Sequence, residues 1–220
     1  MSWDLKEALI LASRKVQSAR EQLCDLDAAL GDGDHGTSMA RSFAAVEKEL
    51  STSGADDPAD LLELVGNTVL NAVGGAMGPL FGSAFLSSGT AVRSFDPEKS
   101  SAERTAAAIA AAANAIQRRG KAAVGDKTMV DAIVPAADAA AAAAKETGAT
   151  SATVLHAAAE AAAAGAEGTK GLVARIGRAS RLGDRTLGHQ DPGATSVTLV
   201  LESLAVSAGA PVRHPILTLQ

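Results

Sequence analysis

The chain has 220 residues, 47% hydrophobic and 20% charged, a balance typical of a folded domain with a substantial core. Its net charge of −5 and aromatic content of 2% argue against nucleic-acid binding, which uses basic residues for phosphates and aromatic rings for bases. One cysteine, Cys24, allows no internal disulfide, and the sequence contains neither a signal peptide nor an apolar run of membrane-spanning length. We therefore expect a cytoplasmic protein that binds neither nucleic acid nor membrane.

Apolar residues recur at helical spacing along the chain, and alanine, the residue with the highest helix propensity, dominates the apolar content. The first apolar stripe covers Leu5–Leu23 and the second Met39–Leu50. Asp57 and Pro58 predict the start of a third helix, because aspartate is a good N-cap and proline suits the first helical position. Further helices are expected at 79–92, 101–118, 126–145, 151–165 and 193–207, with a short one at 170–175.

The predicted fold is all-α, with about eight helices in one domain at residues 1–210 and a C-terminal tail at 211–220. The run Val197–Val200 is also compatible with a buried strand, but it would have no partner strand, so we assign it to the last helix. Glycines cluster between the helices, at 31–36, 74–82, 120–125 and 177–193. Glycine permits positive φ and a close approach of backbone to a ligand, so these loops are candidates for one shared site, with plain helix–helix turns as the alternative.

Three aspartates, Asp27, Asp32 and Asp34, surround the first glycine cluster. Magnesium takes a few carboxylates and completes its shell with phosphate oxygens and water, so these residues predict magnesium ions shared with a nucleotide. An EF-hand calcium loop is excluded, because the twelfth residue counted from Asp32 is Phe43 rather than glutamate. Helix capping by Asp32 or Asp34 is a second role that does not exclude metal binding.

His35 follows these carboxylates, and its imidazole is open to three roles: metal ligand, phosphate contact or general base. Zinc is disfavoured because no second histidine or cysteine accompanies it in a zinc-binding pattern, and we favour a contact near the phosphates. Gly36, Thr37 and Ser38 open the next helix, where free N–H groups and the helix dipole suit an anion.

The remaining loops add weaker candidates. Segment 74–82 lacks the Gly-Lys-Ser/Thr ending of a P-loop but can form a backbone nest for phosphate. Asp126 is expected to cap a helix, and Met129 either lines an adenine pocket or belongs to the core. Segment 177–196 is long and polar with little helical pattern, which favours a functional loop, and the guanidinium of Arg178 matches phosphate geometry.

Four motifs in this order resemble the L subunit of dihydroxyacetone kinase, which is also the C-terminal half of single-chain ATP-dependent dihydroxyacetone kinases. They are LGDGDHG at 30–36, GGAMGPLFG at 74–82, GDKTM at 125–129, and GRAS at 177–180 with GHQDPGATS at 188–196. The resemblance extends from about Leu5 to Ser207, nearly the whole chain.

The resemblance implies a barrel of eight antiparallel amphipathic helices with an ADP or ATP molecule at one end. It implies that Asp27, Asp32 and Asp34 bind two magnesium ions. The nucleotide contacts that it implies are His35, Gly36, Thr37, Ser38, Ala76, Met77, Gly120, Met129, Arg178, Asp191, Pro192 and Gly193. In the phosphotransferase-system version, ADP takes phosphate from a phosphohistidine on an M subunit, and the resulting ATP passes it to substrate on a K subunit.

The sequence departs from the family pattern at two positions. Met77 stands where relatives often carry serine. Its thioether cannot donate a hydrogen bond to phosphate as a hydroxyl can, so only the backbone N–H remains for such a contact. Gly33 replaces a frequent alanine. The K domain, which holds the ketone covalently on a histidine, is not part of this sequence, so none of its four histidines is expected to have that role.

We therefore expect a subunit that transfers phosphate to a small ketose, dihydroxyacetone above all. One alternative is a subunit of a two-chain ATP-dependent kinase for a triose or a tetrose such as erythrulose, with ATP exchanged at every turnover. Another is a regulatory nucleotide-binding module that docks on a transcription regulator. ADP retained through purification would favour the phosphotransferase-system interpretation, and loss of nucleotide would favour the first alternative.

Overall fold

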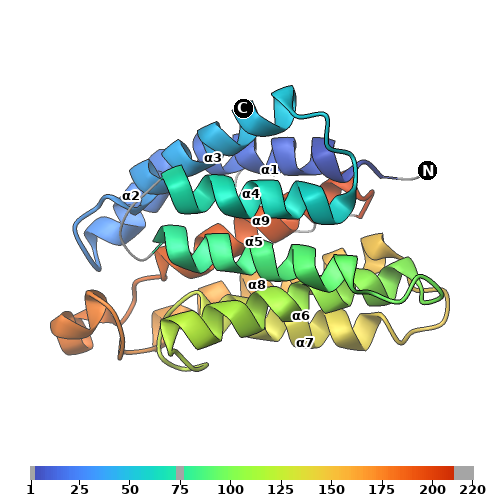
Figure 1. Cartoon of the computed structure of the whole chain (residues 1–220). Helices are drawn as coiled ribbons and strands as arrows, with labels where there is room; N and C mark the ends of the chain where they lie inside the picture. Colours follow the sequence, from blue (N-terminus) through green and yellow to red (C-terminus); the bar gives the residue numbers. More distant parts are fainter. Residues whose placement is uncertain (1–2, 73–76, 211–220) are drawn as a thin grey trace.

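In the computed structural model, which describes residues 3–72 and 77–210, the helices of the chain form a closed ring. The ring contains α1 (Leu5–Ser18), α3 (His35–Thr52), α4 (Pro58–Ala72), α5 (Met77–Arg93), α6 (Ser101–Gly120), α7 (Val130–Ala143), α8 (Ser151–Gly168) and α9 (Pro192–Ser207). Each helix packs on the next in this order, and α9 packs back on α1. Figure 1 shows the helices aligned along one common direction, so the expected barrel of eight helices is confirmed.

Three shorter helices lie at one end of this barrel. The first apolar stripe is divided at Ala19, and its second half forms α2 (Arg20–Ala28), which packs on α3. The 3-10 helices η1 (Thr169–Gly171) and η2 (Ala179–Thr186) lie between α8 and α9. In Figure 1, α2, η2 and the loops before α3 and α7 lie at the same end of the molecule.

Sequence signals explain most helix starts. The carboxylate of Asp57 accepts a hydrogen bond from the Ala59 N–H at 2.9 Å, which confirms its predicted role at the start of α4. Ser100 and Glu103 form a capping box at the start of α6, as serine and glutamate at this spacing do. The run Val197–Val200 is helical within α9, so the assignment of this run to a helix is confirmed.

Two predictions about local structure are wrong. The helix expected from Asp126 begins only at Val130, because the Asp126 carboxylate accepts a hydrogen bond from the Ala123 N–H and caps no helix. The helix expected at 170–175 is limited to the turn η1, and the following residues are not helical.

The barrel interior is filled by small aliphatic side chains and a few aromatic rings. Phe43 packs edge-on against Phe81 and Phe85, with ring centroids 6.5 Å apart in both pairs. Glycine allows the alanine-rich helices to approach closely, since a Cβ at Gly165 of α8 would lie 2.1 Å from the carbonyl oxygen of Asp131 in α7. Within the described residues, no helix combines the length and the apolar character needed to cross a membrane.

Candidate functional site

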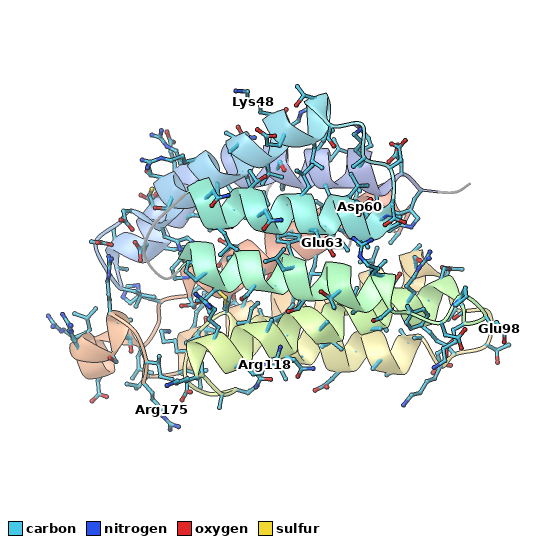
Figure 2. The ribbon with its side chains drawn as sticks, in the orientation of Figure 1. Lys48, Asp60, Glu63, Glu98, Arg118 and Arg175 are labelled. Carbon is cyan, nitrogen blue, oxygen red and sulfur yellow. The ribbon has the colours of Figure 1, made fainter. Side chains whose placement is uncertain are left out.

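Most of the residues singled out from the sequence line one cavity of about 540 Å³ at the end of the barrel where η2 lies. This volume is within the usual range for small-molecule sites. In Figure 2, Arg175, which precedes the Arg178 loop, lies at this end, whereas Glu98 lies at the opposite end. The predicted residues that line the cavity are Asp27, Asp32, Asp34, His35, Ser38, Met77, Gly120, Met129, Arg178, Asp191, Pro192 and Gly193.

Two predicted residues that the structure describes are not among those that line the cavity. Gly36 is buried against α2, where a Cβ would lie 2.0 Å from the Arg20 carbonyl oxygen, so its role in this structure is close helix packing. Thr37 is exposed, and its hydroxyl lies 3.6 Å from the Cys24 sulfur. Ala76 lies outside the described residues.

The three aspartates converge from two segments. Asp27 belongs to the last turn of α2, and Asp32 and Asp34 lie in the connection to α3. One carboxylate oxygen from each residue can be chosen so that all three atoms lie within 4.8 Å of one another. Burial raises the pKa of Asp34, and the neighbouring Asp32 and Asp27 raise it further. A divalent cation among these groups would relieve that repulsion, so the donor set fits a hard metal ion such as magnesium.

Helix capping in this segment differs from the expectation. Asp34 occupies the N-cap position of α3, but its side chain makes no capping hydrogen bond. The carboxylate of Asp27 accepts the hydrogen bond from the His35 N–H instead, at 3.1 Å. The predicted capping by Asp34 is therefore wrong, and Asp27 connects the carboxylate cluster to the start of α3.

Arg178, which directly precedes η2, reaches the same cluster. Its guanidinium forms an ion pair with the Asp32 carboxylate, and its positive charge opposes the rise in the pKa of Asp34. Segment 177–193, in which little helical structure was expected, contains the 3-10 helix η2 directly after Arg178. The arginine is thus presented at the start of a short helix that projects from the barrel (Figure 1).

The N-terminal ends of α3 and α9 meet at the cavity through His35 and Ser196. The His35 Nε2 lies 2.8 Å from the Ser196 hydroxyl, which itself donates to the Pro192 carbonyl oxygen at 3.0 Å. When the serine proton is donated to Pro192, Nε2 carries the imidazole proton and donates it to the serine oxygen. Burial lowers the pKa of His35 to about 4, so the ring is neutral at physiological pH. The general-base role considered for His35 is then limited to its other nitrogen, Nδ1.

Asp191 and Met129 form the adjoining wall of the cavity. Asp191 is the N-cap of α9, accepting from the Ala194 N–H at 2.7 Å, and burial raises its pKa to about 7. Met129 is 5% exposed and packs beside Gly193. A Cβ added to Gly193 would lie only 3.3 Å from the methyl carbon of Met129. Met129 is therefore a core residue, the second of the two roles considered, and it also lines the cavity.

Sequence analysis missed some residues that line the cavity, notably Lys127 and Arg119. Lys127 is 2% exposed, although lysine is almost never buried without partners. The motif GDKTM contains this lysine, but its letters give no indication of burial. A lysine between a glycine-rich turn and a helix start is ordinarily expected at the surface, so no feature of the sequence indicated its burial.

Comparisons with known proteins identify the family of this chain. The family model described as the DAK2 domain matches residues 29–206. The ADP-binding subunit of PEP-dependent dihydroxyacetone kinase 1 from Listeria innocua is 38% identical over 190 residues, which cover 86% of this chain and 88% of the relative. The ADP-binding subunit of the PEP-dependent dihydroxyacetone kinase of Escherichia coli is 39% identical over 188 residues, with 86% and 88% covered.

A solved structure gives the same result for the fold. The dihydroxyacetone kinase from C. freundii, in complex with AMP-PNP and Mg²⁺, superimposes with a TM-score of 0.70 at 27% identity. The match covers 92% of this chain but only 33% of the kinase, so the chain spans about a third of that protein. The family model covers well over half of the chain and the subunit relatives match over most of their length, so this chain belongs to the DAK2 domain family.

Proposed function

We propose that the chain is the ADP-binding subunit of a dihydroxyacetone kinase, and that it transfers phosphate through a magnesium-bound nucleotide to dihydroxyacetone held on a partner subunit. The observation that carries the proposal is the convergence of three carboxylates and two helix N-termini on one cavity. The ADP-binding subunits of two PEP-dependent dihydroxyacetone kinases, matched over most of their length, support it.

The carboxylates of Asp27, Asp32 and Asp34 would hold the metal, and we assign them two magnesium ions. Magnesium supplies charge neutralisation for the phosphate oxygens when it is bound. The first turns of α3 and α9 add backbone N–H groups and the positive ends of two helix dipoles, which suit phosphates. Such local compensation is needed, because a chain of net charge −5 repels an anionic nucleotide.

The remaining predicted residues would place the nucleotide. Met129 offers an apolar surface beside the first turn of α9, which fits an adenine ring, and Arg178 carries a guanidinium toward the phosphates. The full set assigned to the nucleotide is His35, Gly36, Thr37, Ser38, Ala76, Met77, Gly120, Met129, Arg178, Asp191, Pro192 and Gly193. For Gly36 the assignment is restricted to its backbone, because α2 covers its Cα.

Phosphoryl transfer at this site depends on position and charge rather than on covalent chemistry by the chain. Phosphoryl transfer requires an in-line arrangement and neutralisation of charge on the equatorial oxygens. The aspartates would hold the metal, the helix N-termini would hold the phosphates, and Arg178 would add a positive charge. His35 is neutral and its Nε2 lies 2.8 Å from the Ser196 hydroxyl, so it orients the first turns of α3 and α9 and is not a general acid at neutral pH.

The partners follow from what the site does not provide. The ketose would be bound by a K subunit, and the phosphate would come from a phosphohistidine on an M subunit, in line with the PEP-dependent relatives. ADP would then remain on this chain as a cofactor that is phosphorylated again in place. We accordingly expect no ketose phosphorylation by the purified chain with ATP alone.

Isothermal titration of ADP, with and without magnesium, tests the proposal. Asp34→Asn keeps the size of the side chain but removes one of the converging charges, and should abolish the magnesium-dependent part of the affinity. Asp25→Asn is the matched control, because Asp25 is exposed on the same helix as Asp27 and is not in the cluster. Equal magnesium-dependent affinity in both variants would contradict the assignment of the metal site.

A further inference from the structure

Lys127 is a buried cation with an unusual set of partners. Its side chain is as inaccessible as the aliphatic core, and its ammonium donates hydrogen bonds to the carbonyl oxygens of Thr169 and His189. Among the ion pairs formed by residues 3–72 and 77–210, none includes Lys127. An ammonium group has three donors and no acceptor, so it suits a position between backbone carbonyls of two separate segments.

The backbone of Lys127 is fixed as firmly as its head group. Its φ is 61°, in the left-handed region that residues other than glycine rarely adopt. The carboxylate of Asp131 in the first turn of α7 accepts hydrogen bonds from Gly125 N–H at 2.5 Å and Thr128 N–H at 2.8 Å, on either side of Lys127. A strained backbone persists only where its surroundings determine it, and such sites cluster around functional residues.

The two carbonyl partners lead directly to the first turn of α9. His189 is two residues before Asp191, the N-cap of α9. The Thr169 hydroxyl accepts the hydrogen bond from the Asp191 N–H at 2.9 Å. Lys127 thus connects the turn before α7, the end of α8 and the approach to α9, and both Lys127 and the turn 191–193 line the cavity.

We infer that Lys127 is a positioning residue for the nucleotide, which it serves by holding Thr169 and His189 and thereby the first turn of α9. The inference rests on the proposed function and adds to it a residue that does not itself need to touch the nucleotide. Without the ammonium, two carbonyl oxygens lose their donor, and buried Asp191 loses the positive charge that opposes the rise of its pKa. The α9 N-terminus then loses the fixed direction of its N–H groups toward the phosphates.

The test restores the ammonium chemically. Cys24→Ala provides a cysteine-free reference, in which Lys127→Cys is made and then alkylated with 2-bromoethylamine in denaturant before refolding. Alkylation produces a side chain that has sulfur in place of one methylene and carries the same terminal ammonium. Lys121→Cys, treated in the same way, is the matched control, because Lys121 also has a left-handed backbone at this end of the barrel but is exposed.

The measurements are the affinity for Mg·ADP by titration calorimetry and the thermal transition of the ligand-free protein. We expect Lys127→Cys to keep a cooperative transition but to bind Mg·ADP at least tenfold more weakly, and alkylation to recover most of the loss. Both forms of Lys121→Cys should bind as the reference does. Hydrogen exchange of residues 189–194 should be faster in Lys127→Cys and slow again after alkylation.

Unchanged affinity in Lys127→Cys, or a loss that alkylation does not reverse, would overturn the inference. Loss of the cooperative transition would assign Lys127 to the stability of the whole barrel and would also overturn it. Failure of the Cys24→Ala reference and of the wild-type chain to bind Mg·ADP would instead contradict the proposed function, so the two failures are distinguishable.

Discussion

Replacement of Arg178 by alanine should change two affinities in opposite directions. The guanidinium of Arg178 reaches the carboxylate cluster through its ion pair with Asp32. A magnesium ion that binds alone must compete with this positive charge. A nucleotide that arrives with magnesium provides phosphates, which offer the arginine new partners. The same side chain therefore opposes bare metal and favours the metal–nucleotide complex.

The magnitudes follow from exposure and from the type of contact. The side chains of Arg178 and Asp32 are 64% and 53% exposed, and exposed ion pairs contribute roughly 0.2–1 kcal/mol. Arg178→Ala should then strengthen the binding of magnesium alone by at most about fivefold. Loss of a charged contact to phosphate costs roughly 1.5–3 kcal/mol, which weakens Mg·ADP binding about ten- to hundredfold.

Calorimetric titration of MgCl₂, and then of ADP at saturating MgCl₂, measures both effects on one sample. Arg181→Ala is the matched control, because Arg181 lies exposed on η2, which follows Arg178 directly, and forms none of the ion pairs of the described residues. Its two affinities should equal those of the wild type. If Arg178→Ala bound bare magnesium more weakly, or bound Mg·ADP as the wild type does, the proposed exchange of partners by Arg178 would be wrong.

Three further outcomes are expected. Asp32→Asn should weaken magnesium binding and also release Arg178, which limited proteolysis at 177–182 would detect as faster cleavage than in the wild type. Gly165→Ala should lower the free energy of unfolding by about 1–3 kcal/mol, because its Cβ would lie 2.1 Å from the Asp131 carbonyl oxygen. Gly168→Ala is the control, because a Cβ there would meet no atom of another segment within 4 Å. Equal denaturation midpoints of the two variants would refute the prediction. Burial lowers the pKa of His35 from 6.5 to about 4. As pH falls between these values, the unfolded chain takes up a proton that the native state does not, so the free energy of unfolding decreases. This loss of stability, roughly 3 kcal/mol, should be measurable by urea denaturation of the wild type and absent from His35→Gln. Identical pH profiles of stability in the two proteins would contradict the prediction.

The sequence was sufficient to predict the helices and the place of the carboxylates. Helical periodicity and caps such as Asp57 depend only on neighbouring residues, so they are readable from local patterns. The aspartates 27, 32 and 34 lie close in the chain, and a short connection brings them together whatever the rest of the fold does. The glycine-rich loops were also expected to share one site. In a barrel of antiparallel helices every second connection lies at the same end, and residues of these loops line the cavity.

Contacts between distant segments were not predictable in this way. The hydrogen bond from His35 to Ser196 and those from Lys127 to Thr169 and His189 join residues that no local pattern connects. The helix start expected at Asp126 was wrong for a related reason, since the turn before α7 is organised by Asp131 from within the helix. A capping preference is weak, about 1 kcal/mol, and the tertiary contacts of Lys127 outweigh it.

We expect the loop 178–193 to close over the nucleotide, and its contacts divide it into a fixed part and a free part. The Thr186 hydroxyl accepts from Ala174 N–H at 3.0 Å, and Gly188 N–H donates to the Lys170 carbonyl oxygen at 2.8 Å, so the part that approaches α9 is held by hydrogen bonds to the preceding segment. Before Thr186, the contacts of η2 are mainly local, and Gly177 and Gly183 have positive φ. Addition of Mg·ADP should therefore increase protection from hydrogen exchange mostly at 177–183, where closure has to occur. A uniform increase over 178–193, or none, would show that the loop does not bend at its glycines.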